Sequence, residues 1–318
     1  MNFMKIKDKK KESIIFIFLT QFIRIEHVFG WSAISFGGFI LGISSIDISS
    51  NFIPFIVFII STFCIISFTF SINNYYDADS DRNNPRRKDF NAIASGKISK
   101  KTAIILNSFL VVIPLVVTLI FKFYVFLFCI LFIIWMWIYS SPPFRLKSSP
   151  GMDIVWHFFA FVIFVIWGSY IAGTIGLINW LAAISIGAFS LIGQVENHIF
   201  DYNFDKESGT KTLAVLIGLD KTNKILIILT IFHLILLIPL ILLYTLSYYI
   251  TIILTFIISV IGFIFLKGKK DITSVKMLFV KYSTNILGGA VYISCLIYHI
   301  LFLLEMKTLG LLNSIGIP

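Results

Sequence analysis

Two stretches of the chain repeat one spacing of polar residues that suits metal binding. In each stretch an asparagine is followed at intervals of four by two aspartates, and 124 residues separate the two copies. Helical residues four apart share a face, so the carboxylates of each copy stack and repel one another. Mg²⁺ prefers carboxylate and amide oxygens and leaves room for phosphate oxygens. The residues predicted to bind it are Asn73, Asp77 and Asp81 in the first motif and Asn197, Asp201 and Asp205 in the second.

The alternative for either copy alone is a solvated acidic cap at the end of a helix. Both copies carry the asparagine in register, and both lie where an apolar segment meets a basic loop. This repetition favours the metal site over the cap. Asp79 lies off the shared face of the first motif, so we expect it to be solvated or to support the ligands from outside the site.

Basic residues near the two motifs are suited to bind a diphosphate. Lysine and arginine neutralise phosphate oxygens, and arginine can do so through two parallel hydrogen bonds. Taken singly, such residues more often set the orientation of a membrane protein or contact lipid headgroups. Those favoured for diphosphate binding by their closeness to rigid or glycine-hinged positions are Arg145, Lys147 and Lys211. Arg24 is weakly favoured as a phosphate contact over an interfacial residue that reaches toward the headgroups.

The elements that position these residues are predicted to be membrane-spanning helices. Of the 318 residues, 58% are hydrophobic and only 13% are charged, and the mean hydropathy is +0.94. A soluble protein carries about 25% charged residues, so this chain is too apolar to cover a surface in water. The three cysteines lie in separate apolar stretches and are expected to pack as small hydrophobic residues.

Nine segments are long and apolar enough to cross a bilayer, which requires about 20 residues per helix. We expect a cytoplasmic N-terminus and interfacial lead-in over 1–26, the nine helices within 27–304, and a tail over 305–318. The predicted spans are 27–46, 52–74, 102–121, 123–141, 153–174, 178–199, 223–244, 247–266 and 282–304.

The basic residues predict how the helices are oriented. Twenty-four of the 26 lysines and arginines lie in the N-terminal segment or in alternate loops, and only Lys122 and Lys307 lie on the other side. The positive-inside rule therefore places the N-terminus and both motifs in the cytoplasm of a multi-pass cell-membrane protein, with the C-terminus on the opposite side. The net charge of +10 is mostly this topology signal, so the bilayer is an expected partner and nucleic acid is not.

These motifs resemble those of the UbiA family of intramembrane prenyltransferases. The first motif matches the family's Asn-x-x-x-Asp-x-x-x-Asp, and the aspartates of the second match its Asp-x-x-x-Asp. The resemblance covers essentially residues 20–305. Further stretches similar to family signatures are 84–99, 139–147 and 206–214.

The resemblance implies an all-α bundle of nine transmembrane helices around a central cavity open to the cytoplasmic side. It implies that a polyprenyl diphosphate donor binds through two Mg²⁺ ions and that its prenyl chain passes to a lipophilic or aromatic acceptor, with release of diphosphate. The four motif aspartates would be catalytic as metal ligands, with the two motif asparagines assisting. The basic residues would hold the diphosphate, and Tyr139 would hydrogen-bond the leaving group.

The sequence indicates the identity of the acceptor less clearly than it indicates the type of reaction. Residues 24–29 are similar to quinone-pathway members that prenylate aromatic rings, and this acceptor is slightly favoured. Residues 139–147, with Pro150 and Asp153, are closer to members that act on carotenoids or chlorophyll precursors, and a glyceryl-ether lipid stays open. Two other functional classes stay open, a transporter and an inactive lipid-binding relative of the prenyltransferases. The crowding of charge at one face argues against the transporter, and the retained aspartates argue against the inactive relative.

Overall fold

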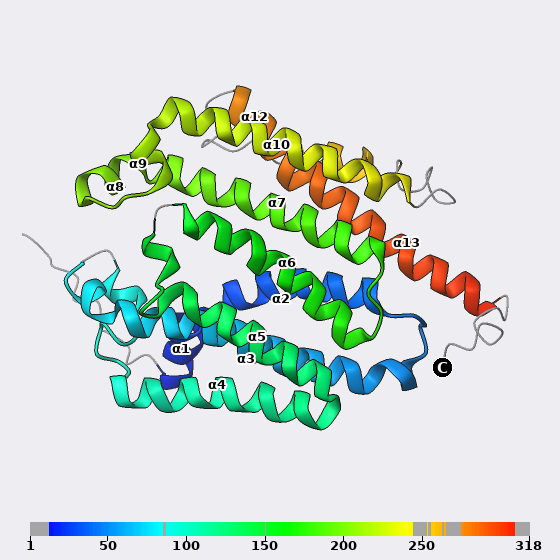
Figure 1. Cartoon of the computed structure of the whole chain (residues 1–318), viewed down its shortest axis with the longest axis horizontal. Helices are drawn as coiled ribbons and strands as arrows, with labels where there is room; N and C mark the ends of the chain where they lie inside the picture. Colours follow the sequence, from blue (N-terminus) through cyan, green and yellow to red (C-terminus); the bar gives the residue numbers. More distant parts are fainter. Residues whose placement is uncertain are drawn as a thin grey trace, which may run out of the picture.

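The fold of the described chain is entirely helical. The computed structural model describes residues 13–84, 87–149, 151–243, 253, 256–262, 264 and 275–308. All regular secondary structure in these ranges is helix, and the long helices run side by side in one bundle (Figure 1). The predicted all-α membrane fold is therefore confirmed.

The bundle is built from long helices joined by short ones. The long helices are α2 (Ile25–Gly42), α3 (Ile48–Arg82), α4 (Lys100–Phe121), α5 (Phe123–Ser140), α6 (Met152–Ala172), α7 (Leu177–Phe200), α10 (Leu219–Leu242) and α13 (Gly289–Thr308). The short helices are α1 (Ile14–Ile17), η1 (Phe18–Phe22), η2 (Lys88–Phe90), η3 (Leu146–Ser148), α8 (Tyr202–Ser208), α9 (Leu213–Ile217), α12 (Val275–Lys281) and η5 (Tyr282–Gly288).

Eight of the nine predicted spans fall on described helices. Seven helices are long and apolar enough to cross a membrane by themselves, counting Met277–Thr308 as one. An eighth is formed if Ile14–Phe22 and Ile25–Gly42, which meet at a bend of 55°, make one span. The predicted span 247–266 lies largely outside the described residues, as does the tail beyond residue 308, so the count of nine stays a prediction.

Helix α3 is the central element, and it carries the first motif. Most residues of its apolar stretch are buried, whereas fewer than a third of those in the apolar stretches of α4 and α10 are. The span predicted to end at residue 74 continues as helix to Arg82. A helix of 35 residues is longer than a bilayer requires. Its last turns therefore extend past the apolar core and present the acidic residues at the end of the bundle.

The contact between α2 and α6 depends on glycine. A Cβ atom on Gly38 would lie 2.0 Å from the carbonyl oxygen of Val165, and one on Gly168 would lie 2.0 Å from that of Ser35. Small residues let helix backbones approach closely in membranes, where water does not drive helices together. This packing fixes α2 against α6 and so sets the position of the residues before α2.

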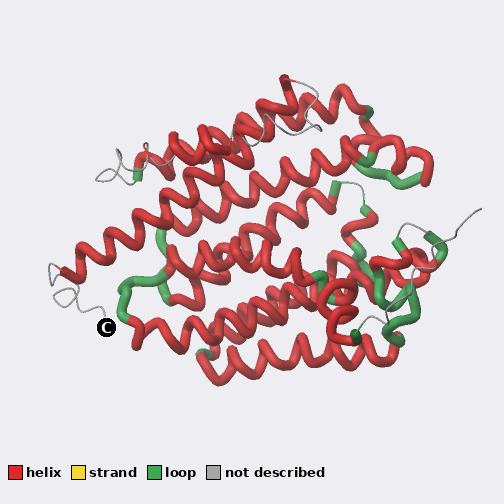
Figure 2. The backbone as a smooth tube through the Cα atoms, turned by 180° about the vertical axis from the view of Figure 1, so that it is seen from behind, coloured by secondary structure: helices red, strands yellow, loops and turns green. Residues whose placement is uncertain are grey.

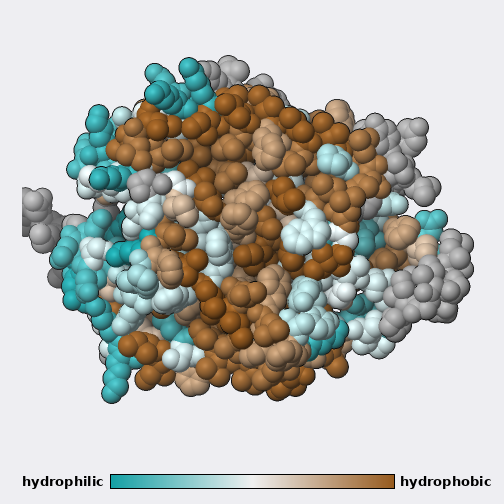
Figure 3. Space-filling model, viewed as in Figure 1, coloured by the Kyte–Doolittle hydropathy of each residue, from teal (hydrophilic) through white to brown (hydrophobic). Residues whose placement is uncertain are grey.

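Both motifs lie at the same end of the bundle. We call this the motif end; it carries the C-terminal turns of α3, α5 and α7 together with α8 (Figure 1). Seen from behind, the loops gather mainly at this end (Figure 2). On the face that Figure 3 shows, the surface is hydrophobic across the middle of the bundle and hydrophilic at the motif end. A hydrophobic belt with a polar end is what a helix bundle seated in lipid requires.

Candidate functional site

Asp77 is the most strongly paired carboxylate of the first motif. Arg145 Nη2 lies 3.0 Å from its Oδ1, and Lys147 Nζ lies 2.5 Å from its Oδ2. The side chains of Asp77 and Lys147 are only 16% and 13% exposed, so this pair is largely shielded from water. Burial lowers the pKa of Lys147, and the charge of Asp77 acts in the opposite direction. Three residues predicted to bind metal or diphosphate are thus in direct contact.

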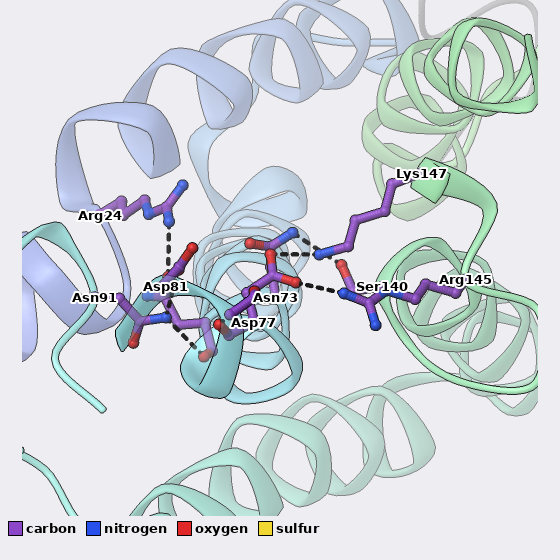
Figure 4. Close-up of polar contacts among 10 residues, drawn as sticks. Arg24, Asn73, Asp77, Asp81, Asn91, Ser140, Arg145 and Lys147 are labelled. Atoms are coloured by element: carbon purple, nitrogen blue, oxygen red, sulfur yellow. Dashed lines mark hydrogen bonds and ion pairs between the residues drawn. The ribbon is translucent and has the colours of Figure 1, made fainter. Parts of the chain in front are cut away.

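Asn73 and Ser140 complete this side of the site (Figure 4). The side-chain amide of Asn73 lies 3.0 Å from Ser140 Oγ. In the amide orientation that satisfies its neighbours, Nδ2 donates to Asp77 Oδ2 at 3.2 Å and the oxygen accepts from Lys147 Nζ at 3.1 Å. Asn73 and Asp77 therefore share a face of α3, as the spacing predicts.

Two arginines of the site have an unusual backbone conformation. Arg24 and Arg145, with φ of 55° and 40°, are the non-glycine residues with positive φ in the described chain. This left-handed region is costly for residues with a Cβ atom, and such strain clusters at functional sites. Arg24 directly precedes α2, and Arg145 directly precedes η3. The sequence predicts both as diphosphate-binding residues.

Arg24 and Asp81 lie on the other side of Asp77 from Lys147 and Arg145 (Figure 4). Asp81 is buried, 7% exposed, and its Oδ2 accepts a hydrogen bond of 2.9 Å from Asn91. Arg24 donates to the side chain of Asn74 at 2.7 Å rather than to a motif carboxylate. The charges of Asp81 and Asp77 nevertheless act on the Arg24 guanidinium. Arg24 thus lies near the site, but its hydrogen bond goes to the side-chain amide of Asn74.

Tyr139 lies deeper, in an aromatic cluster beside the ion pair. Its ring stacks on Trp156 with centroids 4.1 Å apart and meets His157 edge-on at 5.5 Å. Tyr139 immediately precedes Ser140, and it lies within electrostatic reach of Asp77. The predicted hydrogen bond to a leaving group stays a prediction.

The second motif lies where α7 ends and α8 begins. Asp201 directly follows α7, and the backbone bonds from Asp201 N to Asn197 O and from Asp205 N to Asp201 O preserve the helical spacing across the junction. Asn197 and Asp201 are exposed, whereas Asp205 is buried. Burial raises the pKa of Asp205, and the neighbouring charge of Asp201 acts in the same direction. Lys211 is exposed and forms no ion pair in the described chain.

The two motifs do not form one closed cluster. In the described ranges, no three His, Cys, Asp or Glu side chains are grouped closely enough to hold a metal ion. The charge of Arg87 acts on both Arg24, near the first motif, and Asp205, in the second. The donor chemistry nevertheless fits Mg²⁺, because the motif side chains supply only carboxylate and amide oxygens. The structure places these ligand candidates at one end without joining them.

Four buried polar residues near the site are not among those that the sequence predicts to bind metal or diphosphate. Asp153 accepts from His198 Nε2 at 2.7 Å and from Gln194 Nε2 at 3.0 Å, which joins α6 to α7 beside the second motif. His198 lies between Asn197 and Asp201 in the sequence, and this position inside the second motif indicates a place near the site. Asn74 and Asn91 gave no signal, because a single asparagine beside a motif has no period or partner that the sequence reveals.

The solved structures that resemble this chain share its fold. A UbiA homologue from Archaeoglobus fulgidus, determined with GPP and Mg²⁺, is 22% identical, has a TM-score of 0.61 and covers 88% of this chain and 97% of its own. A structure of a digeranylgeranylglyceryl phosphate synthase in membranes is 20% identical, with a TM-score of 0.64 and coverage of 88% and 97%.

Curated relatives match part of the chain. A lycopene elongase/hydratase from Haloarcula japonica is 28% identical over 169 residues, or 49% of this chain and 51% of its own length. A digeranylgeranylglyceryl phosphate synthase from Thermococcus sibiricus is 26% identical over 155 residues, or 48% and 53%. The chain thus spans about half the length of these relatives. The profile of the UbiA prenyltransferase family matches residues 32–308, and the chain therefore belongs to that family.

Proposed function

We propose that this protein is a Mg²⁺-dependent prenyltransferase that moves a polyprenyl chain from an allylic diphosphate to a lipophilic acceptor. The observation that carries the proposal is the shielded contact of Asp77 with Lys147 and Arg145 at the motif end. An isoprenoid diphosphate has an apolar chain and a highly charged head. Apolar helices that end in a cluster of acidic and basic side chains suit both parts.

The residues of the first motif would divide the binding of the head between them. Asp77 and Asp81, with the aspartates of the second motif, would hold Mg²⁺, and the motif asparagines would assist. Lys147 and Arg145 would leave their ion pairs with Asp77 and bind oxygens of the diphosphate instead. When bound, Mg²⁺ supplies Lewis-acid stabilisation of the charge that develops on the departing diphosphate.

The apolar surroundings would protect the reactive carbon. When the allylic C–O bond breaks, the bonding electrons leave with the diphosphate and the carbon becomes cationic. Water must be kept from this carbon until the acceptor's electron pair forms the new bond and the acceptor loses a proton. Tyr139, which lies within electrostatic reach of Asp77, stacks on Trp156, and aromatic faces stabilise cations. Lys211 and Arg24 would contact the diphosphate from the rim.

The names of the relatives favour an isoprenoid lipid as the acceptor. Two of the matched proteins are named lycopene elongase/hydratase, and a third is named digeranylgeranylglyceryl phosphate synthase. These names support the carotenoid and glyceryl-ether alternatives better than the quinone precursor that the sequence slightly favours. We therefore place a carotenoid-type acceptor first and a glyceryl-ether lipid second.

The test is diphosphate release by the purified protein in lipid nanodiscs. Labelled geranylgeranyl diphosphate and Mg²⁺ are supplied with lycopene, a glyceryl phosphate ether or hydroxybenzoate, and the product is identified by mass. We expect Asp77→Asn and Asp201→Asn to lower the rate at least 100-fold, roughly the loss seen when one charge-stabilising group is removed.

The matched control is Asp79→Asn. Asp79 is an exposed carboxylate on the same helix that pairs with Lys100 at 2.7 Å, so this variant should keep the rate. Unchanged turnover in Asp77→Asn would contradict the proposal, as would turnover that persists in chelator.

A further inference from the structure

Asn91 is a buried side chain whose contacts all lead to the first motif or to its own loop. It is 1% exposed. Its Nδ2 donates to Asp81 Oδ2 and to the backbone oxygen of Asn74, both at 2.9 Å. Its Oδ1 accepts from the backbone N–H groups of Ile93 at 3.0 Å and Ala94 at 3.2 Å. Both ends of the amide are therefore satisfied.

Asn74 continues this set of contacts to the start of the chain. Its side chain is fully buried. Its Nδ2 donates to the backbone oxygens of Gln21 and Phe22 at 2.8 and 2.9 Å, and its Oδ1 accepts from Arg24 Nη2 at 2.7 Å. Asn74 of α3 thus fixes both the bent segment before α2 and Arg24, which follows that segment.

The contact between Asn91 and Asp81 is specific to one carboxylate oxygen. Oδ2 of Asp81 accepts from Asn91, and no hydrogen bond reaches Oδ1 from the described chain. The same Nδ2 group also bonds to the backbone of Asn74, seven residues earlier on α3. The amide of Asn91 therefore ties the Asp81 side chain to an earlier turn of α3. Oδ2 of Asp81 is hydrogen-bonded, and Oδ1 is left for a further partner.

We propose that Asn91 is a positioning residue that orients Asp81 for Mg²⁺, and that Asn74 does the same for Arg24 toward the diphosphate. The inference rests on the proposed function. Without the amide, the buried Asp81 would lose its hydrogen-bond donor and rotate. Residues that orient metal ligands by hydrogen bonds contribute about 10- to 100-fold to metal affinity, and we expect this range for Asn91.

The experiment measures Mg²⁺ binding as well as turnover. Mg²⁺ is titrated calorimetrically into protein in nanodiscs saturated with geranyl S-thiolodiphosphate, an analogue that resists cleavage. The test variant is Asn91→Ser, because serine can still accept from the loop N–H groups as an ST turn but is too short to reach Asp81. We expect a dissociation constant for Mg²⁺ raised about 10- to 100-fold and turnover that recovers in part at high Mg²⁺.

The matched control is Asn179→Ala at the other end of the bundle. Asn179 is equally buried, at 1% exposed, and donates to Leu41 O and Ser169 Oγ. The Asn179→Ala variant should have a lower melting temperature but an unchanged affinity for Mg²⁺. A second variant, Asp81→Asn, keeps an acceptor for Asn91 and so reports loss of the ligand with the loop intact.

The outcomes separate the inference from the proposed function. If the wild-type protein neither binds Mg²⁺ nor releases diphosphate, the proposed function fails. If the wild-type protein is active and Asn91→Ser binds Mg²⁺ with unchanged affinity, only the positioning role fails. The same holds if Asn91→Ser merely melts earlier, as the Asn179 control does, or if high Mg²⁺ restores none of its turnover. For Asn74, replacement by Ala should raise the KM for the donor more than it changes kcat, and an unchanged KM would overturn its role.

Discussion

At the scale of residues, Asp77 already has the counter-charges that a largely shielded carboxylate needs. Lys147 and Arg145 supply them in the described structure. A buried charge is tolerated only when it is paired, so these cations and a bound metal compete for the same oxygens. The diphosphate would end this competition by drawing the two basic side chains to its own oxygens. Binding of donor and metal should therefore be cooperative.

Replacing Lys147 tests this competition. Lys147→Met keeps the aliphatic stem but removes the charge, so Asp77 should bind Mg²⁺ more tightly when the donor is absent. The donor loses a charge-assisted hydrogen bond worth about 1.5–3 kcal/mol, so its KM should rise roughly 10- to 100-fold. Calorimetry and initial rates measure the two effects. Lys100→Met, at the exposed Asp79 pair, is the control. Weaker Mg²⁺ binding by donor-free Lys147→Met would contradict the competition.

At the scale of elements, the sequence predicts helices well and loops poorly. The four-residue spacing of Asn73 and Asp77 predicts a shared helical face, and α3 does continue to Arg82. Periodicity of this kind is local, so it can be read from the chain. The contact of Asn91 with Asp81 depends on how the loop around residues 87–99 lies against α3, and no repeat or composition encodes that placement. Likewise, the loop after α5 brings Lys147 to Asp77 across 70 residues of sequence.

The glycine contact between α2 and α6 gives a stability prediction. A methyl group on Gly168 would lie 2.0 Å from Ser35 O and 2.5 Å from Phe39 N, and these backbone atoms cannot move aside easily. Overpacking costs about 1–3 kcal/mol, so Gly168→Ala should lower the melting temperature in detergent. Gly193→Ala, whose Cβ would meet no atom within 4 Å apart from the adjacent residues and backbone of its own helix, is the control. It should be neutral or stabilising by up to about 1 kcal/mol through helix propensity. Equal melting of both variants would contradict the packing argument.

At the scale of the whole molecule, the hydrophobic belt and the polar motif end agree with the distribution of basic residues. The spacing of the lysines and arginines predicts that the motif end faces the cytoplasm. The loop near Asp47, at the start of α3, then lies on the other side of the membrane. This orientation decides where a charged donor must be supplied, because a diphosphate does not cross a bilayer unaided.

Introduced cysteines test the orientation. The three native cysteines are buried, so an impermeant maleimide should label the wild-type protein weakly. Ser80→Cys and Ser208→Cys replace exposed residues at the motif end, and Ser49→Cys replaces an exposed residue at the opposite end. In inside-out vesicles, the first two variants should be labelled and Ser49→Cys should react only after the membrane is permeabilised. In intact spheroplasts the pattern should reverse. Labelling of Ser49→Cys from the cytoplasmic side would place the diphosphate site on the outer face and require the donor to be delivered there.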